Sequence, residues 1–284
     1  MAELDGQVQL DELLLRALAT GDDAPLRAAL VRGSGLPGAR LNLRLVSAFA
    51  SAVGELVVAP DPPVSALETL LDGWAGVPAG EVPTEAPEVI VPCAAVAAYG
   101  EVGAVRPDWW GDEIGKLRRA ATDTRWRIRE VVALALQRML AADWERTVSA
   151  LLEWAGEDDP LVVRAAAAGV AEPPLLRTDG RPESAAQVQR RAVATFRGYP
   201  EQVRRTEPVR VLRQALGFTV SVIIAATGDF ALLAELASSG DPDLRWIARE
   251  NLKKARLQRW PAELDRIRRH MSLPLLPRRT TMER

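Results

Sequence analysis

The stretch TDTRWRIREVVALALQRML, residues 122–140, decides the fold class of this chain. Its apolar residues recur at the spacing of one buried α-helix face, at Ile128, Val131, Val132, Ala135, Leu136 and Met139. After a short break at 141–143, the same spacing continues through Trp144, Val148, Leu151, Leu152 and Ala155. Two such segments predict a helical hairpin, which buries both apolar faces only by packing against further elements.

The opening of this hairpin recurs along the chain. Acidic residues, three of them followed by proline, precede predicted helices at Asp123, Asp159, Glu207 and Asp241, at intervals of 36, 48 and 34 residues. Proline suits the first helical position, and an acid complements the positive helix N-terminus. These intervals are typical of helix-pair repeats. The longest one contains EPPLLRTDGRPES, residues 172–184, which interrupts the helical pattern; Ser184 to Gln187, with capping-box spacing, is predicted to restart it.

With TDTRWRIREVVALALQRML, DDPLVVRAAAAGV and DPDLRWIARENLKKARL, the sequence resembles the HEAT-repeat superfamily, most clearly over 120–258. The resemblance implies an all-α fold, a HEAT-like alpha-solenoid of stacked antiparallel helix pairs, and a binding scaffold rather than an enzyme. We predict an acidic, irregular helical part over 1–105, HEAT-like repeats over 106–272 and a flexible tail over 273–284. The N-terminal helices are expected at 10–20, 24–32, 42–55, 64–76 and 88–100, with LVVA at 56–59 as the best strand candidate.

Composition excludes several classes of site. Cys93 is the single cysteine and His270 the single histidine, so no intrachain disulfide and no histidine-based zinc site is expected. We predict no cofactor. Cys93 lies in an apolar stretch and is expected to be an inert buried thiol. The chain begins without a secretory pattern, and we judge no apolar window long enough to span a membrane, Val209–Thr227 being interrupted by charges. The cytoplasm is the expected compartment.

Charge is unevenly distributed along the chain. Residues 1–105 carry 5 Lys+Arg and 14 Asp+Glu, a charge of −9, whereas residues 106–284 carry 31 and 24, a charge of +7. This asymmetry suggests an acidic partner for the C-terminal part or contact between the two parts.

The candidate partner-binding residues are cations and tryptophans near the start of the repeated helices: Arg125, Trp126, Arg129, Arg164, Arg213, Arg245, Trp246, Arg249 and Lys253. Of these, Arg245, Arg249 and Lys253 lie four residues apart, on one side of a helix. They predict a basic ridge that contacts a protein partner or, as an alternative, the phosphates of a nucleic acid. The interpretation of each cation as part of an ordinary solvated helix face stays open.

A second candidate is the segment containing Trp109, Trp110 and Glu113, as a ligand or base pocket. It partly resembles the HEAT-like alkylpurine DNA glycosylases, which use a Trp, an acid one turn later and an Arg on a neighbouring repeat. Trp109, Glu113 and Arg129 would take these places. The chain departs from that pattern because it has Glu instead of Asp and because only 16 residues separate Glu113 from Arg129. Packing tryptophans with exposed carboxylates are the alternative.

The segment GSGLPG, residues 33–38, matches a glycine-rich phosphate-binding pattern. The residues before it favour a helix instead of the required strand, so we predict a helix-to-helix loop; binding of a small-molecule ligand is the remaining alternative.

Overall fold

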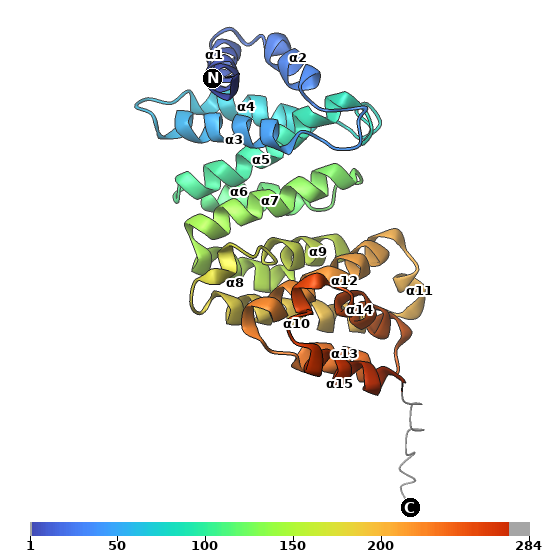
Figure 1. The fold of residues 1–284 in the computed structure, drawn as a ribbon. Helices are drawn as coiled ribbons and strands as arrows, with labels where there is room; N and C mark the ends of the chain where they lie inside the picture. Colours follow the sequence, from blue (N-terminus) through green and yellow to red (C-terminus); the bar gives the residue numbers. More distant parts are fainter. Residues whose placement is uncertain (1, 273–284) are drawn as a thin grey trace, which may run out of the picture. The chain divides into compact units, whose positions relative to one another are not determined.

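The computed structural model describes residues 2–272, and every regular element over these residues is a helix (Figure 1). The all-α fold class is confirmed. The first part of the chain contains α1 (Ala2–Thr20), α2 (Ala24–Arg32), α3 (Leu43–Val58), α4 (Val64–Ala75), η1 (Pro87–Val89), α5 (Ile90–Val105), α6 (Trp110–Ala120), α7 (Trp126–Ala142) and α8 (Trp144–Trp154). The second contains α9 (Pro160–Gly169), η2 (Leu175–Arg177), α10 (Arg181–Gly198), α11 (Glu201–Arg204), α12 (Glu207–Thr227), α13 (Ala231–Ser238), α14 (Pro242–Leu252), η3 (Ala255–Leu257) and α15 (Pro261–Ser272). The predicted tail, 273–284, lies outside the described residues.

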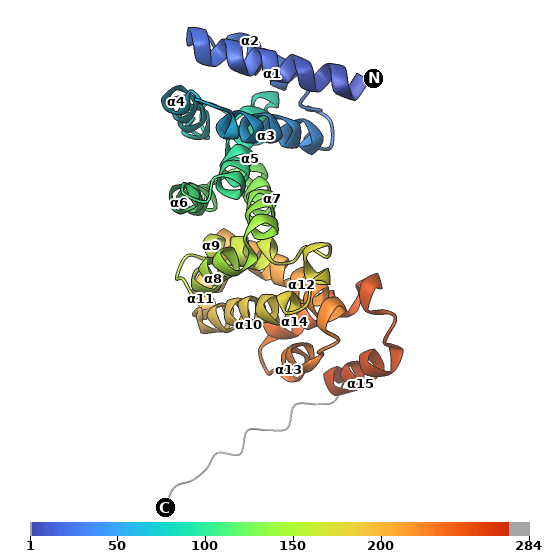
Figure 2. The same ribbon diagram turned by 90° about the vertical axis from the view of Figure 1, so that its left-hand side faces the viewer.

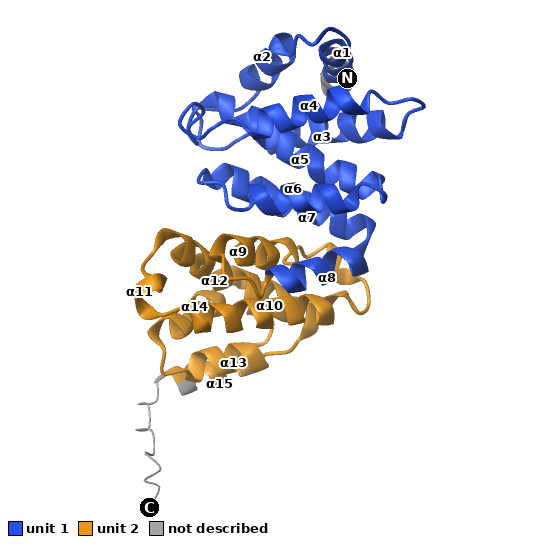
Figure 3. Ribbon diagram, turned by 180° about the vertical axis from the view of Figure 1, so that it is seen from behind, with its two compact units in different colours: residues 1–154 blue, residues 155–284 orange. Residues whose placement is uncertain are grey.

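The chain forms two compact units, residues 1–154 and 155–284 (Figure 3). The predicted division at 105/106 falls inside unit 1, where α5 packs against both α6 and α7. A change in charge along the sequence therefore does not coincide with the boundary between the compact units.

Unit 1 is built around α5, which packs against α3 and α7. Figure 2 shows these three helices following one another, with α4 and α6 on one side of them. The close approach of α5 to α7 depends on Gly100, because a Cβ atom there would lie 2.5 Å from Ala135 Cα. Such short separations are far below van der Waals contact, so this crossing tolerates no larger residue.

Unit 2 is built around α12, which packs against α9, α10 and α14. Two fully buried amides join these helices. Gln189 Nε2 donates to the carbonyl of Ala167 at 2.6 Å, and Asn251 Oδ1 accepts from the Ser221 N–H at 2.8 Å. Buried polar groups are retained where they find partners, and here those partners belong to neighbouring helices.

The acidic markers begin helices as predicted. The Asp159 carboxylate accepts from the N–H of Leu161, at the start of α9. Asp241 accepts from the N–H groups of Asp243 and Leu244, at the start of α14. These bonds satisfy backbone donors that have no partner within the helix.

Where the observed elements differ from the predicted ones, the cause lies in the neighbouring residues. All five N-terminal helices are present, but LVVA at 56–59 is not a strand, since α3 continues through Val58. Likewise α10 begins at Arg181 and not at Ser184, because Gly180 adopts φ +81° and Pro182 suits the first turn. The Ser184 hydroxyl donates within the helix instead of capping it.

Two segments, Pro87–Val105 and Glu207–Thr227, are long and apolar enough to cross a membrane by length and composition. The prediction that no window approaches that length was therefore wrong. Within the fold, 78% and 61% of these windows are buried, and the core helix of a folded protein passes the same test.

Candidate partner-binding site

A groove of about 660 Å³ in unit 2 brings together three of the predicted site residues. It is lined by residues of α14, the segment after it, and α15: Arg245, Arg249, Leu252, Lys253, Gln258, Arg268 and Met271. Every charged residue in this lining is a cation. We call it the basic groove.

The division of α14 into two faces produces one wall of the basic groove. Leu244, Ile247 and Ala248 are buried toward the core of unit 2, and Leu252 is 5% exposed at the floor of the groove. Arg249 and Lys253 are exposed on the other face, one helical turn apart. On α15, buried Leu264 and Ile267 hold the helix in place and leave Arg268 exposed.

The groove cations differ in how far they are already engaged. Arg245 donates to the Met271 carbonyl at 2.7 Å, which ties α14 to the last turn of α15. Lys253 pairs with Glu250 at 2.6 Å, and Arg268 with Asp265 at 3.0 Å. Within residues 2–272, Arg249 has no ion-pair partner. Arg249 is thus the groove cation most available to an incoming anion.

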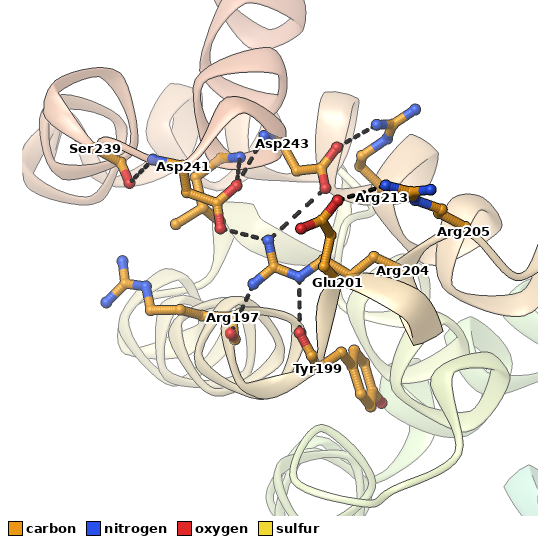
Figure 4. Close-up of polar contacts among 10 residues, drawn as sticks. Arg197, Tyr199, Glu201, Arg204, Arg205, Arg213, Ser239, Asp241 and Asp243 are labelled. Atoms are coloured by element: carbon orange, nitrogen blue, oxygen red, sulfur yellow. Dashed lines mark hydrogen bonds and ion pairs between the residues drawn. The ribbon is translucent and has the colours of Figure 1, made fainter.

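Arg213 belongs to a separate polar network at the start of α14, shown in Figure 4, and Trp246 lies against it. Arg204 donates to Asp241 and lies 3.7 Å from Asp243, which also accepts from Arg213. The Arg213 guanidinium lies over the Trp246 ring, 4.7 Å from its centroid. This network joins α11 and α12 to α14, so Arg213 and Trp246 do not add to the basic groove.

Two of the three candidate partner-binding residues of unit 1 are buried and make polar contacts within that unit. Arg125 is 3% exposed and forms a double hydrogen bond with Asp123 at 2.7 and 2.9 Å. Arg129 is 4% exposed and donates to the carbonyls of Asp123 and Thr124. Only Trp126 is exposed, at 44%. We therefore remove Arg125 and Arg129 from the candidate surface. Arg164 is half-buried on α9, outside the groove lining.

Trp109, Trp110 and Glu113 are held by neighbours in unit 1. The Arg106 guanidinium covers the Trp109 ring at 4.1 Å, and Trp110 Nε1 donates to Thr147 at 3.2 Å. Glu113 is 3% exposed and pairs with Lys116 at 3.1 Å. Of the carboxylates in this segment, Asp108 and Asp112 are exposed as the alternative of packing tryptophans expected, whereas Glu113 is buried. A buried, paired Glu113 and a buried Arg129 do not form the accessible base pocket of a glycosylase.

Glu113 is the most perturbed acid of this region. Burial raises its pKa to about 7, and the Lys116 ammonium opposes that rise. Its Oε2 atom is buried without a hydrogen-bond partner. The arrangement gives the fold a carboxyl group that changes protonation near neutral pH.

The GSGLPG segment connects α2 to α3, which confirms the helix-to-helix loop. Gly35 adopts φ +78°, and a Cβ there would lie 2.8 Å from the Arg40 carbonyl oxygen. The Asn42 side chain donates to the Gly33 carbonyl at 2.9 Å and accepts from the Leu45 N–H. Gly35 therefore allows the tight turn of this loop. The loop follows helix α2 and not the strand that a dinucleotide site requires.

The predicted site residues do not include the α15 side of the basic groove. Arg268 and Met271 flank the apolar stripe of α15, and that position was a usable signal, but the sequence does not show which helix α15 faces. A larger cavity, of about 1150 Å³, was also missed. It lies between the 172–184 insertion, the end of α12 and η3, and its rim mixes Arg177, Arg256 and Arg259 with Asp179 and Glu183.

No model of a protein family matches the sequence, and no curated protein matches it significantly. The candidate site therefore rests on the geometry and charge of the chain itself.

Proposed function

We propose that this protein is a noncatalytic interaction module of the HEAT-repeat type, which binds an acidic partner in the basic groove of unit 2. One observation carries the proposal: every charged side chain that lines the groove is a cation. A surface of one charge sign attracts partners of the opposite sign and raises their association rate.

The HEAT-type architecture is supported by the order of packing within each unit. In unit 2, α9, α12 and α14 each begin at an acidic marker, and α12 packs against both of the others. In unit 1, α5 packs in the same way against α3 and α7. Repeated helix pairs that each contact their neighbours would produce this order.

The groove cations can still pair with an incoming anion, and this supports a binding role over a purely structural one. Exposed ion pairs such as Lys253 with Glu250 contribute about 1 kcal/mol or less, so an incoming carboxylate can replace the internal one at little cost. Arg249 needs no such exchange. Its planar guanidinium can bind a carboxylate through two parallel hydrogen bonds.

The test is binding of fluorescent polyglutamate to the full chain, measured by anisotropy at several salt concentrations. We expect binding that weakens as salt rises, because exposed charges are screened. The double variant Arg249→Glu with Lys253→Glu should lose most of this affinity. The matched control, Arg16→Glu with Arg40→Glu, changes the charge equally at exposed positions of unit 1 and should bind as the wild type does. No binding, or equal loss in both variants, contradicts the proposal.

A further inference from the structure

Building on this proposed function, we infer that the groove's partner is a short acidic peptide segment with an apolar anchor residue, and not a nucleic acid. The anchor would lie on Leu252 and Met271, while flanking carboxylates bind Arg249 and Lys253.

The first support is the apolar part of the groove. Leu252 and Met271 line it together with the cations, and Met271 is only half-buried. A methionine side chain is flexible and polarisable, and it adapts to apolar side chains of different shapes. A phosphodiester backbone gains nothing from such a contact, whereas a leucine or phenylalanine of a peptide does.

The second support is the modest charge of the groove. Lys253 and Arg268 already carry carboxylate partners in Glu250 and Asp265. Proteins that bind duplex DNA make roughly 6–10 phosphate contacts. With two of its cations already beside internal acids, the groove suits one or two carboxylates better than a long row of phosphates.

The third support is the lack of aromatic rings in the groove lining. The nearest tryptophans in sequence are used elsewhere in unit 2. Trp246 lies against Gly217 and under Arg213, and Trp260 packs edge-on against Phe230. Proteins that hold single-stranded nucleic acids stack bases on aromatic side chains, and this groove offers none.

The spacing of the cations sets the partner's spacing. Arg249 and Lys253 lie one helical turn apart, about 6 Å along the axis. Carboxylates at the same separation occur in a peptide helix at positions i and i+4, with an apolar residue between them free to face the groove floor.

The experiment compares capped, labelled peptides on the full chain at physiological salt. The first has two glutamates four positions apart with leucines between them; the second replaces the leucines with alanines, and the third replaces the glutamates with glutamines. We expect the first to bind about tenfold more tightly than either of the others, since each lacks one of the two contributions. A single-stranded oligothymidylate and a DNA duplex serve as nucleic-acid probes and should bind more weakly than the first peptide.

Met271 separates this inference from the proposed function. Met271→Ala should weaken the leucine peptide about fivefold more than it weakens the alanine peptide or polyglutamate, because the contact it removes is the apolar one and the Met271 carbonyl that holds Arg245 remains. Met271→Leu should restore the peptide affinity. Circular dichroism and melting temperature confirm that each variant is folded.

The outcomes are distinct. If polyglutamate binds through Arg249 and Lys253 but the leucine and alanine peptides bind equally, the inference fails and the proposed function stands. Tighter binding of either nucleic-acid probe than of the first peptide also overturns the inference. If no acidic probe binds at all, the proposed function fails with it.

Discussion

At the scale of single residues, the polar side chains that are buried inside each unit affect the stability of the fold more than the exposed ones do. Glu113 is an example. Between the ordinary pKa of a glutamate and its raised value of about 7, the folded state keeps the Glu113 proton while the unfolded state releases it. Stability therefore falls as pH rises through this window.

We expect Glu113→Gln to remove this dependence, because the amide is uncharged at every pH. Relative to the wild type, the variant should gain about 1–3 kcal/mol in the free energy of unfolding between pH 5 and pH 8. Urea denaturation at the two pH values measures this. Glu153→Gln, at an exposed position of α8, is the control and should show no such gain. A pH-independent difference for Glu113→Gln would refute the titration argument.

Asn251 makes the second residue-scale prediction. It is fully buried, accepts from the Ser221 N–H, and donates to the carbonyl of Leu216 at 2.8 Å. Asn251→Ala leaves these α12 groups without their partner, so we expect a loss of about 2–3 kcal/mol. Gln187→Ala, an exposed amide on α10, should change stability by less than about 0.5 kcal/mol. Similar losses in the two variants would show that burial is not the cause.

At the scale of elements, helix crossings are set by glycines as much as by large apolar residues. Gly100→Ala would place a methyl group against the backbone of α7, and we expect a loss of about 3 kcal/mol as α5 and α7 move apart. Gly73 is an exposed glycine inside α4 with no atom near its missing Cβ. Gly73→Ala should therefore stabilise the protein by about 0.5–1 kcal/mol, because alanine favours the helix. Thermal denaturation of the two variants should give shifts of opposite sign; a neutral Gly100→Ala would mean that the crossing is looser than described.

At the scale of the whole molecule, the division into two units predicts where binding resides. The fragment 155–284 contains the complete basic groove and a core centred on α12. We expect it to fold into a helical domain and to bind polyglutamate within about twofold of the full chain, since a compact unit with its own core can fold alone. Circular dichroism checks the fold and anisotropy the affinity. A folded fragment that does not bind would assign part of the site to unit 1.

Helical class and most helix positions could be predicted from the sequence because both are local properties. The apolar spacing after Trp126 and the cap at Asp159 act over a few residues, and both signals agree with the structure. The exceptions are local as well: Gly180 starts α10 earlier than the capping-box spacing at Ser184 suggests.

The candidate site was only partly predictable. Helical periodicity placed Arg249 and Lys253 on one face of α14, and they do line the basic groove. The same reasoning could not exclude Arg125, whose guanidinium is covered by the residues around Val82, more than forty positions earlier in the chain.

By itself, the sequence of this protein determined an all-α chain, the start of several of its helices and the uneven distribution of charge. The tertiary structure decided which cations are exposed and which are buried in contacts within the fold. It also placed Arg268 and Met271 opposite α14. The physical reason is the range of the interactions. Helix periodicity and capping act within one or two turns, whereas exposure of a side chain depends on elements that come from distant parts of the chain.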